Sequence, residues 1–360
     1  MQFTKTIRSM VRALPFSLLS AALLLWLPPD SRAAGKLVVR VMQQNMDAAT
    51  DLGFITSATD PKSLMIGLVK TIQEISASKI RQREGMLAQE IANLQPDLVA
   101  LQEVTLYRKG PLNQPPATEV MHDQLQSLMD ALQQRGLHYA VVAVNTLFDA
   151  EAPTPLGFDF RMTDRDAMLA RTDLAPSNFL LSNVQQGIYQ AEWVFGNPVL
   201  GSIQVPRGWM TVDVQVGVAA FRFANTHLES PPAPSDIQVA QATELMQILS
   251  GTTLPVALLG DFNANAEAGQ DHYPTTDVIL GAGFVDAWHA QHPFDAGYTW
   301  PLHGEDAYPP SAQPYERIDL IFLRGLGAAK VVKTGDRPSS SGLWLSDHNG
   351  VFAYVPMPEL

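Results

Sequence analysis

The stretch VALLGDFNA, at residues 256–264, decides the fold. Four apolar residues and Gly260 form a run that is typical of a β-strand buried on both faces. Asp261 and Asn263 follow directly, one residue apart, so the period-two geometry of an extended chain points both side chains to the same side. We therefore expect a buried central strand that delivers one carboxylate and one amide to a common site at its end.

Polar side chains that can bind a metal follow apolar runs at five other places in the chain. Strand ends are where β-rich and α/β scaffolds carry binding sites, and polar groups are costly to gather beside a core unless something binds between them. Each string alone also has an ordinary interpretation as a helix cap, a turn or a hydrogen-bonded histidine. Their number and order favour one shared site. The strings are QNMD at 44–47, LQEV at 101–104, NTHL at 225–228, RIDLI at 317–321 and SDHN at 346–349.

The side chains in these strings suit a hard divalent cation. Carboxylate and amide oxygens outnumber the imidazoles of His227 and His348, and such a set suits magnesium, manganese or calcium better than zinc. A cation of this kind beside a phosphate can polarise it and help to activate water. The oxygen donors are Asn45, Asp47, Glu103, Asp261, Asn263, Asp319 and Asp347.

The remaining sequence predicts many strands and few helices. Apolar residues over 64–94 recur mostly every three or four positions, which predicts two helices, and we expect further helices over 120–135 and 236–249. Prolines and glycine predict loops over 109–118 and 150–164. This mixture indicates an α+β fold of stacked sheets flanked by helices.

The ordered set of strings resembles the endonuclease/exonuclease/phosphatase superfamily, which includes deoxyribonuclease I. The resemblance spans Leu37 to Val355 and includes Gln-Asn, Leu-Gln-Glu, Thr-His-Leu, Gly-Asp-Phe-Asn, Arg-Ile-Asp and Ser-Asp-His in the superfamily's order. It implies a four-layer α/β/β/α sandwich, in which two central, mostly antiparallel sheets are flanked by helices. It also implies a water-attack mechanism with no covalent enzyme intermediate.

The resemblance further implies a role for each string. Metal ligands would be Asn45, Glu103 and Asp347, holding Mg²⁺ or alternatively Mn²⁺ or Ca²⁺. Asp261 would orient or deprotonate the attacking water, and Asn263 would hold a phosphate oxygen. His348, polarised by Asp319, would contact the phosphate, and His227 would stabilise the phosphate or assist the leaving group. The catalytic set is then His227, Asp261, Asn263, Asp319, Asp347 and His348.

The first 33 residues have the layout of a cleaved secretory signal peptide. A basic start precedes the apolar stretch 14–27, two prolines break it, and small residues follow at 31–34. The stretch is short for a membrane span. We expect export to the periplasm or the extracellular space, and one catalytic domain over 34–360. The chain has no cysteine, which excludes thiolate enzymology, disulfides and cysteine zinc sites.

The net charge limits the choice of substrate. It is −12 for the full chain, and the first 33 residues carry four basic and one acidic side chain, so the mature chain carries −15. Such a surface repels nucleic-acid phosphates at long range, although divalent cations in the site would offset part of that field. The prediction is an exported, metal-dependent phosphoester hydrolase, and first a phosphodiesterase of the nuclease or sphingomyelinase kind. A phosphomonoesterase on inositol or sugar phosphates, or an inactive binding protein, is the alternative. We expect a monomer with no stable protein partner.

Two further segments have alternative interpretations. Residues 50–78 resemble an insertion beside the site, and we favour a packed amphipathic helix over a substrate lid. Arg161, Arg165 and Arg171 are interleaved with acids. One of them could hold a phosphate through two parallel hydrogen bonds, but we expect most of them to pair with the neighbouring carboxylates.

Overall fold

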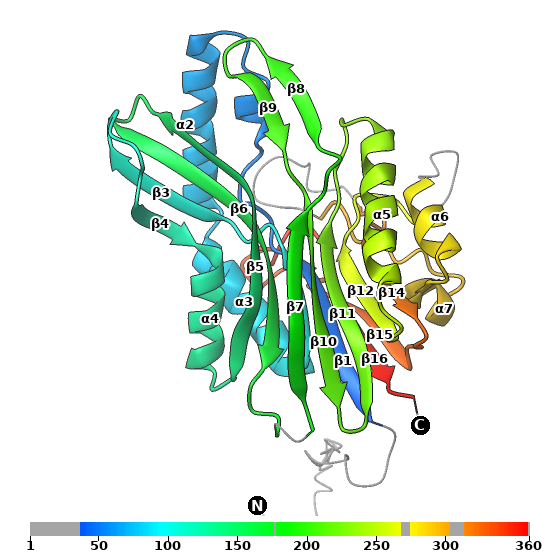
Figure 1. The fold of residues 1–360 in the computed structure, drawn as a ribbon. Helices are drawn as coiled ribbons and strands as arrows, with labels where there is room; N and C mark the ends of the chain where they lie inside the picture. The colour runs from blue at the N-terminus through cyan, green and yellow to red at the C-terminus, as the bar shows by residue number, and fades with distance from the viewer. Residues whose placement is uncertain (1–36, 176–177, 268–273, 303–312, 359–360) are drawn as a thin grey trace, which may run out of the picture. The chain divides into compact units, whose positions relative to one another are not determined.

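The computed structural model describes residues 37–175, 178–267, 274–302 and 313–358. The expected signal peptide, residues 1–33, lies outside the described residues. Two large sheets pack face to face (Figure 1). Most strand pairs are antiparallel, and the exceptions are β1 with β2 and β11 with β12. No helix within these ranges is both long and apolar enough to cross a bilayer.

The first sheet has the strand order β15-β16-β1-β2-β6-β3-β4, with β5 paired to β6. Its strands are β1 (Val38–Asn45), β2 (Leu98–Gln102), β3 (Leu106–Pro111), β4 (Glu119–Asp123), β5 (Tyr139–Pro153), β6 (Phe158–Arg171), β15 (Lys330–Thr334) and β16 (Gly350–Pro356). The second sheet has the order β13-β14-β12-β11-β10-β7. Its strands are β7 (Leu180–Ile188), β10 (Gly208–Val216), β11 (Ala219–His227), β12 (Val256–Asp261), β13 (Val285–Asp286) and β14 (Asp319–Arg324). A separate two-stranded hairpin is formed by β8 (Trp193–Asn197) and β9 (Gly201–Val205).

Helices cover the outer face of each sheet. On the first sheet, α3 (Ile80–Leu94) and α4 (Gln124–Gln134) bury Leu87 and Leu128 against Val99 of β2. On the second, α5 (Ser235–Ser250) and α6 (Pro274–Gly281) bury Leu245 and Ile279. Two short helices, α1 (Gly53–Thr56) and α7 (Ala287–Gln291), complete the set with α2 (Pro61–Ala77). The predicted four-layer α/β/β/α sandwich is therefore confirmed.

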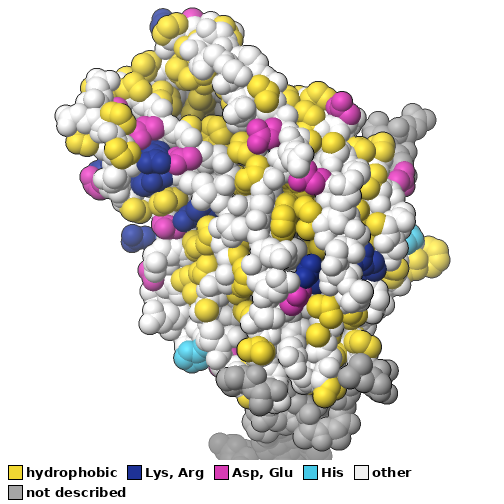
Figure 2. Space-filling view, viewed as in Figure 1, with side chains coloured by type: hydrophobic (Ala, Val, Ile, Leu, Met, Phe, Trp, Pro, Cys, Tyr) yellow, Lys and Arg dark blue, Asp and Glu magenta, His cyan; other side chains and the backbone are white. Residues whose placement is uncertain are grey.

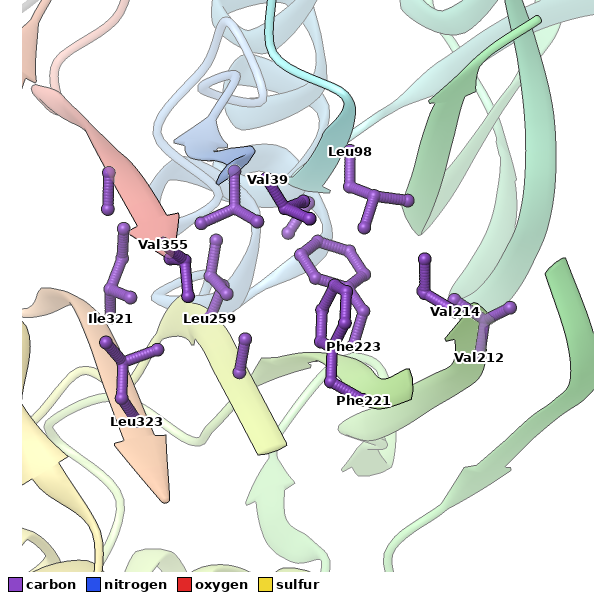
Figure 3. Close-up of a cluster of buried hydrophobic side chains, with 14 of the residues drawn as sticks. Val39, Leu98, Val212, Val214, Phe221, Phe223, Leu259, Ile321, Leu323 and Val355 are labelled. Atoms are coloured by element: carbon purple, nitrogen blue, oxygen red, sulfur yellow. The ribbon is translucent and has the colours of Figure 1, made fainter. Parts of the chain in front are cut away.

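The main core lies between the two sheets. Val39 and Leu98 from the first sheet meet Phe223, Leu259 and Ile321 from the second, and all five are at most 2% exposed (Figure 3). At roughly 25 cal/mol per Å² of apolar surface removed from water, burial of each such side chain stabilises the fold by about 1.5–3 kcal/mol. This contact fixes the strand ends of the two sheets opposite each other.

The segment over 50–78 forms a packed helix, as we favoured. Asp60 caps α2 with its side chain, and Leu68, Ile72 and Ile75 of α2 are buried. These side chains belong to one apolar cluster with Tyr107 of β3 and others from β6. The insertion therefore extends the core beyond the sandwich.

Two boundaries differ from the sequence-based expectation. The region over 150–164, expected as a loop, is a hairpin in which β5 and β6 meet at a turn, with Gly157 at φ 88°. Phe158, Phe160 and Met162 alternate along β6 and pack in the cluster with α2, but the prolines and the glycine at the turn hide this period in the sequence. Helix α4 starts at Gln124 rather than at residue 120, because the residues before it pair with β3 as β4.

Candidate active site

Six strand ends meet at one edge of the sandwich. The carboxyl ends of β1 and β2 lie side by side, with Asn45 opposite Gln102. In the other sheet His227 at the end of β11 lies opposite Asp261 at the end of β12, and Asp261 lies opposite Asp319 at the start of β14. Strand β16 runs antiparallel to β1, so the loop before it returns to the same edge. The topology thus brings together side chains up to 300 residues apart.

Asn45 connects the two sheets at this edge. Its Nδ2 donates to Glu103 Oε1 at 3.0 Å and to Asp261 Oδ2 at 2.9 Å. Glu103 also accepts the backbone N–H of Ala48 at Oε2, at 2.7 Å. The backbone of Glu103 has φ 53°, a left-handed conformation that is uncommon outside glycine and asparagine. Such strain is found at sites where neighbouring structure fixes a functional side chain.

A row of buried neutral amides supports these carboxylates. Gln43 Nε2 donates to Asp319 Oδ1 at 2.6 Å and to Gln102 Oε1 at 2.9 Å. Gln102 in turn donates to Asn225 Oδ1 at 2.7 Å, and Asn225 donates to the backbone carbonyls of Leu101 and of a residue in β6. Since buried polar groups are stable only when they are hydrogen-bonded, this row fixes the sheets in one relative position.

His348 and Asp319 form a buried acid–imidazole pair. The Nδ1 atom of His348 lies 2.9 Å from Asp319 Oδ2. Burial opposes a charge on this imidazole, but the carboxylates of Asp319, Asp347 and Asp261 outweigh it and raise the pKa of His348 well above its usual value. His348 is therefore the cation of the site at neutral pH.

Asp261 has the features of a proton acceptor. Burial, reinforced by Asp319 and opposed by His348, raises the pKa of Asp261 to about 7. A carboxylate in that range exchanges protons readily near neutral pH. Its Oδ1 accepts the backbone N–H of Asn263 at 2.9 Å, and Asn263, at φ 48°, donates its own Nδ2 to the carbonyl of Leu228.

His227 is buried and has a cationic neighbour. Nη1 of Arg207 lies 2.9 Å from its Nε2 and 3.2 Å from its Nδ1. The nearest carboxylate oxygens, on Asp166 and Asp261, are each 3.7 Å from a ring nitrogen. Burial, together with the charges of Arg207 and His348, lowers the pKa of His227 well below its usual value. His227 is therefore neutral in this arrangement, in contrast to His348.

The donor set fits a hard divalent cation. Glu103, His227 and Asp261 form a group whose ligand atoms all lie within 4.8 Å of one another, and Asp261, Asp319 and His348 form a second such group. Both groups are rich in carboxylate oxygen, as Mg²⁺, Mn²⁺ and Ca²⁺ require. The two groups share Asp261. Because a charged His348 has no free lone pair for a metal, the group of Glu103, His227 and Asp261 is the one that fits a cation.

The last two predicted ligands lie at the rim. Asp47 forms an ion pair with Arg83, with 3.0 Å between Nη1 and Oδ2. Asp347 accepts the indole N–H of Trp300 at 3.3 Å, and its Oδ1 lies 3.9 Å from His348 Nε2. Asp347 belongs to neither of the groups just described. Trp300 therefore lies against the site.

Sequence reasoning missed three charged residues of the site. Asp164 and Asp166 lie two apart on β6, on the face toward the site formed by Glu103, His227, Asp261 and His348, which we call the cleft. The Oδ1 atom of each has no hydrogen-bond partner among the described residues. Burial, then the charge of Glu103, raises the pKa of Asp164 to about 7. Arg207, between β9 and β10, is the third. The arginines interleaved with these acids do pair with carboxylates, as we favoured, but Arg171 alone pairs with a neighbour in sequence, Asp173. Arg161 pairs with Asp149 of β5 and Arg165 with Asp123 of β4.

Comparison with protein families agrees with this geometry. The model of the Endonuclease/Exonuclease/phosphatase family matches residues 81–348, which is most of the chain. The chain belongs to this family. No curated protein sequence matches it significantly. The members of the family are metal-dependent phosphoesterases, and this protein is accordingly an enzyme that hydrolyses phosphoesters with a divalent metal.

Solved structures share the fold at low sequence identity. D. rerio TDP2, complexed with a single-strand DNA product, is 18% identical, with a TM-score of 0.52 over 88% of this chain and 98% of that chain. A Bacteroides thetaiotaomicron protein of the same family is 16% identical, with a TM-score of 0.53 over 91% of this chain and 100% of that chain. A mannosyl-6-phosphatase from the same organism is also 16% identical, with a TM-score of 0.52 over 88% and 99%. At these identities the likeness establishes the fold.

Proposed function

We propose that the protein is an exported, divalent-metal-dependent phosphodiesterase that uses water as the attacking group. The observation that carries this proposal is the pair of links at the strand ends: Asn45 joins Glu103 to Asp261, and Asp319 holds His348. One cleft is thus bordered by three groups: a carboxylate that can bind a cation, a carboxylate that can accept a proton, and a cationic imidazole. These are the groups that hydrolysis of a phosphoester requires.

Each residue has a proposed role. Glu103, with Asn45 and Asp347, holds the cation, and a bound cation would polarise a phosphoryl oxygen and lower the pKa of nearby water. Asp261 orients the attacking water and accepts its proton. His348 binds a phosphoryl oxygen as a cation while Asp319 fixes its ring, and Asn263 donates to a second oxygen. His227 contacts the phosphate on the side of β11.

Charge favours a diester over a monoester. Glu103 and Asp319 supply carboxylates at the cleft, whereas burial raises the pKa of Asp164, Asp166 and Asp261 and weakens their negative charge near neutral pH. A phosphomonoester carries about two negative charges at neutral pH and a diester carries one, so the monoester is repelled more strongly. We therefore place phosphodiesters first.

The surface offers little electrostatic attraction for a long nucleic acid. The net charge of the full chain is −12. On the face shown in Figure 2, Lys and Arg side chains are few and scattered, and several lie beside Asp or Glu. Duplex binding normally uses a basic patch or stripe. We therefore favour a short or small diester substrate, including a phospholipid head group, over duplex DNA.

Turnover of bis-p-nitrophenyl phosphate tests the proposal. We expect activity with Mg²⁺, Mn²⁺ or Ca²⁺, none with excess chelator, and slower turnover of p-nitrophenyl phosphate. Glu103→Gln, Asp261→Asn and His348→Ala should each lower the rate by about 10²–10⁴-fold. The exposed residues Asp236 and His289 supply matched controls, as Asp236→Asn and His289→Ala. Equal rates in wild type and His348→Ala with every ester tried would refute the proposal.

A substrate panel and a fractionation experiment address the finer points. Plasmid DNA, RNA, sphingomyelin and inositol phosphates should separate the nuclease, phospholipid and phosphomonoester alternatives.

For export, we expect cleavage after about residue 33 and recovery of the processed chain from the periplasm or the medium. A full-length chain that stays in the cytoplasm would contradict export without affecting the hydrolase proposal.

A further inference from the structure

The cleft contains two buried histidines with opposite partners. His348 faces a carboxylate, since its Nδ1 lies 2.9 Å from Asp319 Oδ2. His227 faces a guanidinium, since Arg207 Nη1 lies within 3.2 Å of both of its ring nitrogens. The carboxylates near His227 are farther away, at 3.7 Å. The two imidazoles are therefore held by different chemistry.

Arg207 is anchored through its side chain by Glu229 and through its backbone by Tyr189. Its Nε and Nη2 donate to Glu229 Oε1 at 3.2 and 3.1 Å, and its backbone carbonyl accepts the N–H of Tyr189 at 2.9 Å. The Arg207 side chain is 12% exposed and that of Glu229 is 1% exposed. With two donor nitrogens used by Glu229, the remaining one is aimed at His227. The planar fork of arginine allows this double use, and a lysine ammonium cannot reproduce it.

Glu229 is itself fixed in place. Its Oε1 accepts the backbone N–H of Ser230 at 3.0 Å, and its own backbone N–H donates to Gln241 of α5 at 2.8 Å. Gln238 of the same helix donates to the Glu229 carbonyl and to the carbonyl of Asn263. The anchor of Arg207 is therefore tied to the loop that carries Asn263.

The two distances define the contact between Arg207 and His227. A nitrogen that lies 2.9 and 3.2 Å from both nitrogens of one imidazole must lie over the ring face, because in the ring plane it would collide with the carbon between them. The planar guanidinium of Arg207 therefore packs on the face of His227, as arginine does on aromatic rings. The ring cannot tilt without losing this contact.

We propose that Arg207 is a positioning residue that is held by Glu229, fixes the orientation of the His227 imidazole in the cleft and adds a fixed positive charge on the β11 side. This inference rests on the proposed hydrolysis, because His227 serves there as a phosphate contact. It also divides the work between the two histidines. His348 is oriented by the carboxylate of Asp319, whereas His227 is oriented by the guanidinium of Arg207, which also places a fixed charge on that side.

Chemical rescue tests the positioning role. Arg207→Ala should lower kcat for bis-p-nitrophenyl phosphate by about 10–10²-fold and change KM by less than threefold. Guanidinium ion at non-denaturing concentration should restore part of that kcat, whereas Arg207→Lys should restore less, because an ammonium cannot contact Glu229 and His227 together. Arg171→Ala is the matched control, since Arg171 pairs with Asp173 at the opposite end of the sheet and its variant should not respond to guanidinium. If guanidinium leaves Arg207→Ala unchanged, Arg207 is only structural and the inference is wrong.

A second readout does not depend on activity. In the metal-free, chelated protein, the ¹⁵N chemical shifts of the His227 ring should report the guanidinium packed against it. These signals should move in Arg207→Gln and Glu229→Gln, while the His348 signals stay in place. Unchanged His227 signals in both variants would overturn the inference. Absence of turnover in the wild type would instead refute the proposed function, and the ring signals would still decide whether Arg207 holds His227. If Arg207→Ala does not fold, Glu229→Gln carries the same test.

Discussion

Replacing Glu84 by glutamine should remove a pH-dependent loss of stability. Glu84 of α3 is 1% exposed, and its Oε2 has no hydrogen-bond partner among the described residues. Burial, opposed by Arg83, raises its pKa from 4.5 to about 8. The unfolded chain therefore releases this proton near pH 4.5, while the folded protein retains it to about pH 8. Between these values the folded state binds one more proton, so the free energy of unfolding falls as the pH rises.

The size of this effect follows from the shift. Each pH unit in the window costs about 1.4 kcal/mol, so stability lost between pH 5.5 and pH 7.5 amounts to about 3 kcal/mol at most. Glu84→Gln cannot ionise and lacks this loss. Its stability relative to wild type should therefore rise with pH across the window, whatever the constant cost of burying the amide.

Urea unfolding at several pH values, with chelator present, measures this difference. Carboxylates elsewhere titrate in both proteins, so their contributions cancel in the comparison. The exposed residue Glu119 supplies the control, and Glu119→Gln should follow the wild-type profile. Parallel profiles for wild type and Glu84→Gln between pH 5.5 and pH 8 would show that Glu84 is ionised in the folded state, against this reasoning.

Three further changes should have measurable effects. Asn197→Ala should lower the free energy of unfolding by about 2–3 kcal/mol in urea titration, because Asn197 is buried and donates to two backbone carbonyls of the loop before α2. Gly260→Ala should lower the free energy of unfolding by about 1–3 kcal/mol or more in the same assay, because an added Cβ would lie 2.1 Å from the carbonyl oxygen of Thr226. Gly196→Ala is its control, since an added Cβ there has nothing within 4 Å. Equal stabilities of the two variants would contradict the packing argument. Asp319→Asn should lower kcat by about 10²–10⁴-fold and shift the basic limb of the kcat–pH profile to lower pH. The shift follows because His348 loses the carboxylate that raises the pKa of its ring. An unshifted basic limb would contradict the pairing of His348 with Asp319.

The strand-end positions of the site could be predicted because two local patterns coincide. A continuous apolar run marks a buried strand, and polar residues directly after it mark the end that faces solvent or a ligand. Asp261 and Asn263 satisfy both conditions, and so does Glu103 after β2, whereas His348 lies in the loop before β16 and does not follow a strand. Nothing in these patterns depends on a distant part of the chain, so the sequence was sufficient.

Arg207, Asp164 and Asp166 lack such a pattern. Asp164 and Asp166 alternate with arginines on β6, and alternating charge suggests a solvent-exposed strand with surface ion pairs. Arg161 and Arg165 do form ion pairs with carboxylates near the surface, on Asp149 and Asp123. The aspartates point to the opposite face, which is covered by the second sheet and faces the cleft. Their function depends on which face the sheet packing buries, and that is a tertiary property.

The buried amides explain how the fold tolerates so many carboxylates at one edge. Glu103, Asp261 and Asp319 repel one another in a region of low dielectric. Asn45 and Gln43 donate to all three carboxylates without adding charge, so these bonds join the sheets and add nothing to the pairing of Asp319 with His348. Cationic side chains in place of Asn45 and Gln43 would neutralise the carboxylates further and weaken the attraction for a divalent cation. Neutral donors beneath the carboxylates therefore stabilise the sandwich and preserve the charge on which the metal-dependent chemistry depends.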